Sequence, residues 1–203
     1  GTARYGAAAC EYGGDKGIFG YGFATGSPPQ VSVTNLVSNV GVVGTDVTGV
    51  GTTRHGLAAC EYGTDTAIFG FGWWDGTEVS MTNLVSNAGV VATDVTGVGT
   101  TRYDLAACGY GTDKGIFGYG EGSVYSLTNL ITNVGVVGTD VTGVGTARAG
   151  LGSCEYGYTK GIFGYGAPGY VSMTNLVSDV GVVGTDVTGV GTARTGIGAC
   201  SFN

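Results

Sequence analysis

Cysteine is the most reactive residue type in this chain, and its spacing is regular. Five cysteines stand 46 to 50 residues apart, each after a run of small and apolar residues. They are Cys10, Cys60, Cys108, Cys154 and Cys200. No Cys-x-x-Cys motif or histidine accompanies them, as a zinc site would usually require. A disulfide would need Cα atoms within about 7 Å of each other. We expect free, largely buried thiols that pack as small apolar groups, with a metal ring of converging cysteines as the alternative.

The other candidates for catalysis are isolated. His55 is the only histidine, and its equivalents in other copies of the repeat are Tyr5, Tyr103 and Ala149. No Ser–His–Asp arrangement therefore recurs, and we expect His55 to be an ordinary surface residue. The loop acids are Asp75, Glu78 and Glu121. They do not pair by sequence, whereas a glycosidase needs two carboxylates about 5 to 10 Å apart across a pocket. The sequence predicts no enzyme, no metal site and no cofactor.

An aspartate and an arginine recur once per copy. The aspartates, in the motif Thr-Asp-Val-Thr, are Asp46, Asp94, Asp140 and Asp186. We expect these carboxylates to accept hydrogen bonds from backbone amides. Calcium binding is the alternative, although calcium needs about six to eight oxygen ligands and no Asp-x-Asp-x-Asp loop is present. The arginines are Arg4, Arg54, Arg102, Arg148 and Arg194, and we expect each to bond carbonyls or an aspartate of the neighbouring copy.

These residues recur because the chain repeats itself. The motif Thr-Asp-Val-Thr-Gly-Val ends four units, at 1–50, 51–98, 99–144 and 145–190, and a fifth start follows at 191–203. A period of about 20 to 50 residues is typical of proteins in which one supersecondary unit is copied and neighbouring copies bury each other's faces. The sequence therefore predicts a single repeat domain, with 191–203 as an extra inner strand.

Each unit has the pattern of four short strands. In the third unit they cover 102–110, 114–120, 125–131 and 136–141, separated by segments with turn chemistry. β-Branched Val and Thr dominate, and neither a helical stripe nor a capped helix is found. Four short antiparallel strands per unit predict an all-β fold, a β-propeller in which small inner-strand residues crowd at the axis. A β-solenoid with two rungs per unit is the alternative.

Composition excludes several classes of function. Charged residues make up 11% of the chain and the net charge is −7. Without a basic patch, binding of nucleic acid by phosphate neutralisation is not expected. No uninterrupted apolar stretch reaches the length of about 18 residues that a membrane-spanning helix needs. We expect no nucleic-acid partner and no membrane insertion.

The copies differ mainly at one end. The loop between the second and third strands varies in length and covers 23–30, 73–78, 121–124 and 167–170. In an antiparallel blade this loop lies on the same side as the residue after each arginine, which also varies. Binding residues are often carried on loops held by a rigid scaffold, and Trp and Tyr are favoured anchors. Unconstrained drift of surface loops is the alternative. The sequence predicts a ligand-binding face formed by Phe23, Trp73, Trp74, Asp75, Glu121, Tyr170, Tyr5, His55 and Tyr103.

The repeat resembles the kelch repeat over all four units. The arginine that opens the innermost strand matches. Gly20 and Gly22, with their copies, stand where kelch has a glycine doublet, split here by an aromatic residue. The kelch Tyr–Trp pair is missing, and Val42, Val43 and their copies fill that region, so the match is kelch-like. Runs such as Gly-Thr-Asp-Lys-Gly-Ile-Phe-Gly-Tyr-Gly also look like repeats of bacteriophage structural proteins, near tail-fibre and virion-surface modules.

These resemblances imply a setting and partners. A tail-fibre or virion-surface adhesin would be extracellular or on the virion. It would bind a host-surface glycan or protein, with copies of itself or other virion proteins as further partners. Non-enzymatic recognition is therefore the leading hypothesis. The alternatives are a purely structural propeller, in which 191–203 completes a blade of another chain, and a glycosidase-type propeller.

Overall fold

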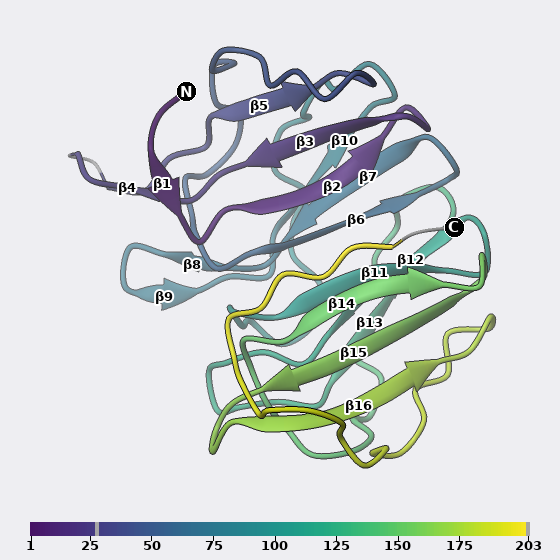
Figure 1. The fold of residues 1–203 in the computed structure, drawn as a ribbon. Helices are drawn as coiled ribbons and strands as arrows, with labels where there is room; N and C mark the ends of the chain where they lie inside the picture. Colours follow the sequence, from purple (N-terminus) through teal and green to yellow (C-terminus); the bar gives the residue numbers. More distant parts are fainter. Residues whose placement is uncertain (27–28, 202–203) are drawn as a thin grey trace.

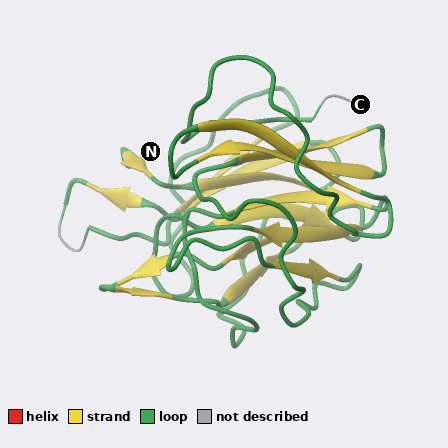
Figure 2. Ribbon diagram, turned by 90° about the horizontal axis from the view of Figure 1, so that it is seen from below, coloured by secondary structure: helices red, strands yellow, loops and turns green. Residues whose placement is uncertain are grey.

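The computed structural model describes residues 1–26 and 29–201, so two residues of the first variable loop and the last two of the fifth start lie outside it. The described residues form short strands joined by loops (Figure 1). Figure 2 shows that no helix occurs in these ranges. A helix able to cross a membrane is accordingly absent from the described part of the chain. The prediction of an all-β fold is confirmed.

Each unit forms one three-stranded antiparallel sheet. The first two sheets consist of β2 (Ala8–Tyr12), β3 (Lys16–Gly20) and β5 (Thr34–Val37), and of β6 (Ala58–Tyr62), β7 (Thr66–Gly70) and β10 (Thr82–Val85). The other two consist of β11 (Ala106–Tyr110), β12 (Lys114–Gly118) and β13 (Thr128–Ile131), and of β14 (Gly152–Tyr156), β15 (Lys160–Gly166) and β16 (Val171–Val177). Strand order follows the sequence, so the strand that carries the cysteine always lies at one edge.

The expected fourth strand of each unit is reduced to a bulged segment. In the first unit, the N–H of Gly44 donates to the carbonyl of Leu36 and the N–H of Val47 to that of Thr34. One residue separates Leu36 from Thr34, but two separate Gly44 from Val47. The extra residue breaks the ladder, as in a β-bulge. The same two bonds recur in the other units. The bulge includes Asp46, whose carboxylate bonds to other residues of its unit.

The first strands of successive sheets, β2, β6, β11 and β14, lie next to one another, and the sheets extend away from this row (Figure 1). Glu11, Glu61 and Glu155, which come from the first, second and fourth units, line one cavity. In a straight row the first and fourth of these strands would be too far apart to share a cavity. The row of first strands is therefore curved.

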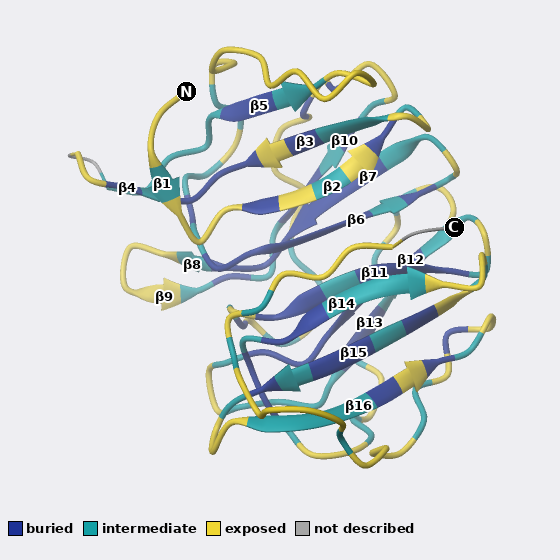
Figure 3. Cartoon of the chain, in the orientation of Figure 1, coloured by how far each residue is buried: buried dark blue, intermediate teal, exposed yellow. Residues whose placement is uncertain are grey.

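The apolar core lies between the sheets, and each of its three clusters combines residues of two consecutive units. Phe69 of the second unit is completely buried against Gly20 of the first, where an added Cβ would lie 2.6 Å from the phenyl Cζ. Phe117 packs on Gly70 in the same way. Figure 3 shows buried segments running through the middle sheets and exposed segments at the outer edges. Each unit therefore buries its neighbour's face, as expected for a repeat domain.

Four further strands complete the pairing at one end of the molecule. β1 (Arg4–Tyr5) pairs with β4 (Phe23–Ala24) of the first unit, and β8 (Trp73–Trp74) forms a ribbon with β9 (Thr77–Glu78).

The two ends of the chain lie along different units. β2 pairs with β3 of its own unit. The N–H of Gly196 instead donates to the carbonyl of Gly150 at 2.9 Å. Residues 191–201 therefore lie along the fourth unit and do not replace β2.

Candidate functional site

The two sets of variable positions meet at the same edge of the molecule. The residue after each arginine bridges directly to the start of the variable loop of its own unit. The pairs are Tyr5 with Phe23, His55 with Trp73, Tyr103 with Glu121, and Ala149 with Ala167. Antiparallel pairing of the loop start with the segment after the arginine produces this meeting in every unit. Variable positions that are far apart in the sequence are thus adjacent in space.

Aromatic side chains from three units form a line along this edge. The ring of Phe23 lies 5.2 Å from both Tyr5 and His55, and that of Trp73 lies 5.0 Å from Tyr103 in an edge-to-face arrangement. The backbone pairing of His55 with Trp73 joins the two groups. We call these five residues the aromatic rim. Ring contacts at such distances add to the stability that burial of surface area provides. The five side chains of the rim are therefore held in a defined arrangement.

The two tryptophans have different surroundings. They are consecutive residues of β8, and consecutive strand residues point to opposite faces. Trp73 is half-buried against Tyr103, whereas Trp74 is exposed. Only Trp74 therefore presents a free indole. Beside it, Asp75 is exposed at the tip of the ribbon with a φ of 42°.

Tyr103 brings two loop carboxylates together. Burial raises its pKa, and the charges of Glu121 and Glu78 add to the rise. Glu78 also lies 3.7 Å from the place where a Cβ on Gly122 would stand. The sequence did not pair these two acids, because they belong to different units. Tyr170, the last candidate, is exposed just before β16.

His55 lies within the aromatic rim and is half-buried there. Burial lowers its pKa, so the imidazole is neutral at pH 7. Within the described residues, its Nδ1 is buried without a hydrogen-bond partner. Unpaired buried polar atoms are uncommon in folded proteins. The sequence excluded His55 from a catalytic triad and placed it on the predicted ligand-binding face, and in the structure it lies between Phe23 and Trp73 in the rim.

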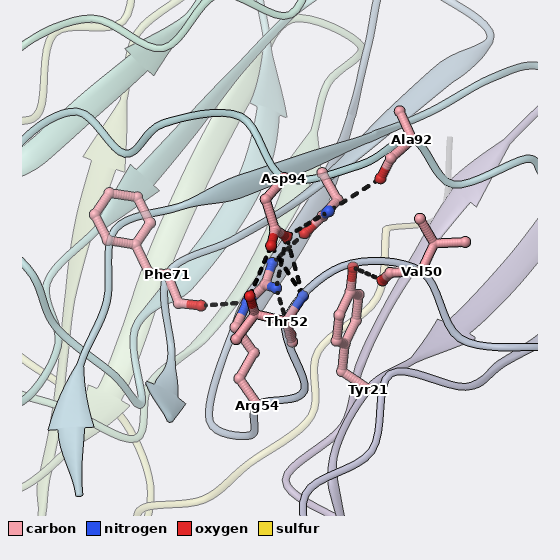
Figure 4. Close-up of polar contacts among 8 residues, drawn as sticks. Tyr21, Val50, Thr52, Arg54, Phe71, Ala92 and Asp94 are labelled. Atoms are coloured by element: carbon pink, nitrogen blue, oxygen red, sulfur yellow. Dashed lines mark hydrogen bonds and ion pairs between the residues drawn. The ribbon is translucent and has the colours of Figure 1, made fainter. Parts of the chain in front are cut away.

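The repeated arginines are structural. Arg54 donates hydrogen bonds from Nε to the carbonyl of Phe71 at 2.9 Å, and from its terminal nitrogens to the carbonyl of Thr52 and the amide oxygen of Asn83 (Figure 4). Its guanidinium lies 4.3 Å above the ring of Tyr21, which belongs to the preceding unit. The predicted carbonyl bonds are present. The contact with the neighbouring unit is made through the aromatic ring, while the nearby aspartate, Asp94, belongs to the same unit.

The repeated aspartates bond backbone amides, as predicted. Asp94 accepts hydrogen bonds from the N–H and the hydroxyl of Thr52 and from the side-chain amide of Asn83. Burial raises the pKa of its carboxyl, but these hydrogen bonds outweigh burial and hold the pKa below its usual value. Thr52 begins the unit and Asp94 lies near its end. Each aspartate therefore links the end of its unit to the beginning, and its carboxylate oxygens already have hydrogen-bond partners.

All five cysteines are free, as predicted. Cys60 and Cys108 are buried, but Cys10 and Cys154 are half-buried and Cys200 is exposed. The sulfur of Cys60 lies against Gly115 and that of Cys108 against Gly161, each a glycine of the next unit. Burial raises the pKa of Cys108 to about 12. These middle thiols therefore act as packing groups.

A cluster of carboxyl groups lies beside the cysteines on the first strands. Glu61 and Glu155 both reach over Gly109, where an added Cβ would lie 2.7 Å from the Glu155 carboxylate. Burial, then the charges of Glu11 and Glu155, raises the pKa of Glu61 to about 7. The groups line a cavity of about 350 Å³. No arrangement able to hold a metal occurs among the described residues. The signal missed in the sequence was the glutamate after the cysteine, which recurs in the first, second and fourth units and is replaced by Gly109 in the third.

Comparison with known proteins adds no identity. Neither the models of known protein families nor the curated proteins include a match to this chain. The candidate sites are therefore judged on their geometry.

Proposed function

We propose that this chain is a non-enzymatic recognition module that binds a glycan or a surface protein through the aromatic rim. The observation that carries the proposal is the line of five aromatic side chains from three units, with Trp74 exposed beside it. Aromatic rings are amphipathic and rigid, so they bind partners at a low cost in conformational entropy. They also stack on the apolar faces of sugar rings. The neutral His55 and the acids around Tyr103 supply polar contacts.

The scaffold of this proposal is an open, kelch-like propeller. Its blades are the four sheets, with the bulged segments in place of regular fourth strands. The curved row of first strands and the small residues on them support it, because inner strands crowd together at a propeller axis. The arginines and the split glycine doublets connect successive blades, in line with the kelch-like pattern of the sequence.

The biological setting belongs to the same proposal. The likeness to bacteriophage repeats favours a tail fibre or virion surface, or another extracellular site. The partner would be a host-surface glycan or protein, and copies of the chain or other virion proteins would be further partners. This setting rests on the sequence pattern alone.

A glycan array tests the proposal with one substitution on the aromatic rim and one at the exposed indole beside it. We expect the wild-type chain to bind a subset of immobilised oligosaccharides, and Tyr5→Ala and Trp74→Ala to lose that binding. Tyr158→Ala is the matched control, because Tyr158 is 67% exposed, close to the 64% of Tyr5, but lies at the opposite end of its sheet. All three variants should unfold within about 1 kcal/mol of wild type, since exposed side chains contribute little.

Two results would contradict this reading. Binding that survives both Tyr5→Ala and Trp74→Ala would exclude the aromatic rim and the indole beside it as the binding surface. An equal loss of oligosaccharide binding in Tyr158→Ala would show that the effect is not specific to the rim. A chain that binds no oligosaccharide would leave surface proteins as the only ligand class, to be tested with the same variants.

One observation favours the structural alternative. The bulged segments carry exposed valines in every unit. They include Val42, Val90, Val136 and Val182. A row of exposed apolar residues on outer edges is typical of contact surfaces between proteins. An assembly role predicts that Val→Ser changes at these positions abolish association between chains, whereas alanine substitutions on the rim do not.

The glycosidase alternative has less support. The carboxylates of Glu61 and Glu155 both reach over Gly109, 3.6 and 2.7 Å from the position of an added Cβ. Glycosidase carboxyl groups stand about 5 Å or more apart, because a sugar or a water must fit between them. Two carboxylates that reach over the same glycine leave little such space.

A further inference from the structure

The same contact joins consecutive units three times. A phenylalanine of the second strand packs on a glycine of the preceding unit, and its ring meets an aromatic residue there edge to face. The phenylalanines are Phe69, Phe117 and Phe163, all completely buried, and the ring distances are 5.2, 5.1 and 5.2 Å. The glycines are Gly20, Gly70 and Gly118. The chain therefore contains three examples of one interface.

The fourth unit presents the same surface uncovered. An added Cβ at Gly164 would meet only Thr174, at 3.2 Å, among the described residues. Tyr156 is 36% exposed, whereas its equivalents Tyr12, Tyr62 and Tyr110 are buried. In the other units these tyrosines pack against a glycine of the next unit. The fourth unit thus has the receiving half of the interface without the half that fills it.

Residues 191–201 have already taken the place of the next first strand. The guanidinium of Arg194 lies 4.5 Å above the ring of Tyr165, as Arg148 lies 4.4 Å above Tyr119. The N–H of Gly166 donates to the carbonyl of Arg194 at 2.9 Å, and Ile197 packs against Gly152. What remains open beside this segment is the position of a second strand.

We propose that the face of the fourth unit, together with 191–201, is an acceptor site for the second and third strands of a further unit of this same repeat. The three internal interfaces define the fit: a phenylalanine above Gly164, a glycine above Tyr156, and backbone pairing to 198–201. Adding a strand to an open edge gives affinity through main-chain bonds and specificity through alternate side chains. The inference does not depend on the aromatic rim.

A disulfide to one of the cysteines can hold a docked unit covalently in place. Cys60 Sγ lies 2.7 Å from the position of a Cβ on Gly115, and Cys108 Sγ lies 2.6 Å from that on Gly161. These separations are close to those of a disulfide, in which the sulfur of one cysteine approaches the Cβ of the other. A cysteine at the glycine position of a docked unit would therefore stand against Cys154.

The experiment uses the full chain with Cys200→Ser and a synthetic peptide of residues 111–144 carrying Gly115→Cys. This peptide contains the sequences of β12, β13 and the bulged segment. We expect a mixed disulfide with Cys154, located by mass mapping under mild oxidation. Phe117→Ser in the peptide, or Gly164→Leu in the chain, should lower the yield about tenfold or more, because each removes the ring contact.

Three outcomes would overturn the proposal. The first is a mixed disulfide that forms equally at Cys10, or equally with the Phe117→Ser peptide. The second is the absence of coupling at Cys154. The third is a yield that Gly164→Leu in the chain leaves unchanged, which would place the peptide elsewhere on the chain.

Discussion

At the residue scale, one polar network recurs in every unit, and from the second unit onward an aromatic ring of the preceding unit packs against its arginine. In the third unit, Arg102 is completely buried and bonds the carbonyls of Tyr119 and Thr100 and the side chain of Asn129. A buried guanidinium is costly unless its donors are satisfied. The ring of Phe71, 4.2 Å below it, covers one face. The repeated arginine is therefore explained by packing between units and needs no ligand.

Asn129 is the residue on which this network depends most. It accepts a hydrogen bond from Arg102 and donates to the carbonyl of Gly138 and to Asp140. We expect Asn129→Ala to lower the free energy of unfolding by about 3 kcal/mol, since it leaves buried polar partners unpaired. Urea unfolding measures the loss. Asn133→Ala is the control, because this exposed asparagine bonds only Asp113 and should cost about 0.5 kcal/mol or less. Equal losses would refute the network.

At the element scale, the first strands carry both the packing thiols and the carboxyl cluster. Where the third strand has Gly109, the carboxyl groups of Glu61 and Glu155 occupy the space a side chain would fill. The cluster is thus created by a missing side chain on one strand and by curvature that brings the others toward it. Its protonation should be linked to the stability of the fold.

We expect a pH dependence of stability from Glu61. Its pKa is raised from 4.5 to about 7 in the folded chain, so the folded state binds this proton more tightly than the unfolded state. The contribution is fully present below pH 4.5 and is lost as the pH rises through 7. After allowance for partial exposure, about 1 to 2 kcal/mol should disappear. Urea unfolding at pH 5 and pH 8 measures it, and Glu61→Gln should reduce the difference. An unchanged difference in Glu61→Gln would assign it to another group.

At the scale of the whole molecule, stability comes from interfaces between units, and the units differ in how many they make. The middle two units are covered on both faces. The first leaves Phe19 44% exposed, although its equivalents Phe69, Phe117 and Phe163 are completely buried. In a repeat protein, such end units are held by one interface instead of two. Substitutions at equivalent positions should therefore have unequal effects.

The glycines that receive the phenylalanines test this directly. At Gly118 an added Cβ would lie 2.7 Å from the Cζ of Phe163, whereas at Gly164 it would meet only Thr174 among the described residues. We expect Gly118→Leu to cost about 3 kcal/mol of unfolding free energy by overpacking, and Gly164→Leu to cost less than about 1 kcal/mol. Chemical unfolding of both variants checks the difference. Similar costs would show that the fourth unit's glycine is enclosed as well.

The sequence by itself determined the local structure. Alternating Val and Thr predicted the strands, and the turn residues between them predicted antiparallel pairing, because these signals act within about ten residues. Comparison of the four copies also placed the variable positions on one side, since antiparallel pairing dictates which loops share an end. The bulge at the fourth strand was not foreseen, because it depends on the bonds that Asp46 and its copies make to residues about 40 positions away.

Only the tertiary structure decided how the units meet. The orientation of Trp73 toward Tyr103, the convergence of Glu61 and Glu155, and the uncovered face at Gly164 all depend on how neighbouring units pack. Phenylalanines pack on glycines of the preceding unit, and tyrosines pack on glycines of the next unit. Four nearly identical units read alike in the sequence. Their environments differ because burial depends on neighbours, and the first and fourth units each have a face that no other unit covers in the described residues.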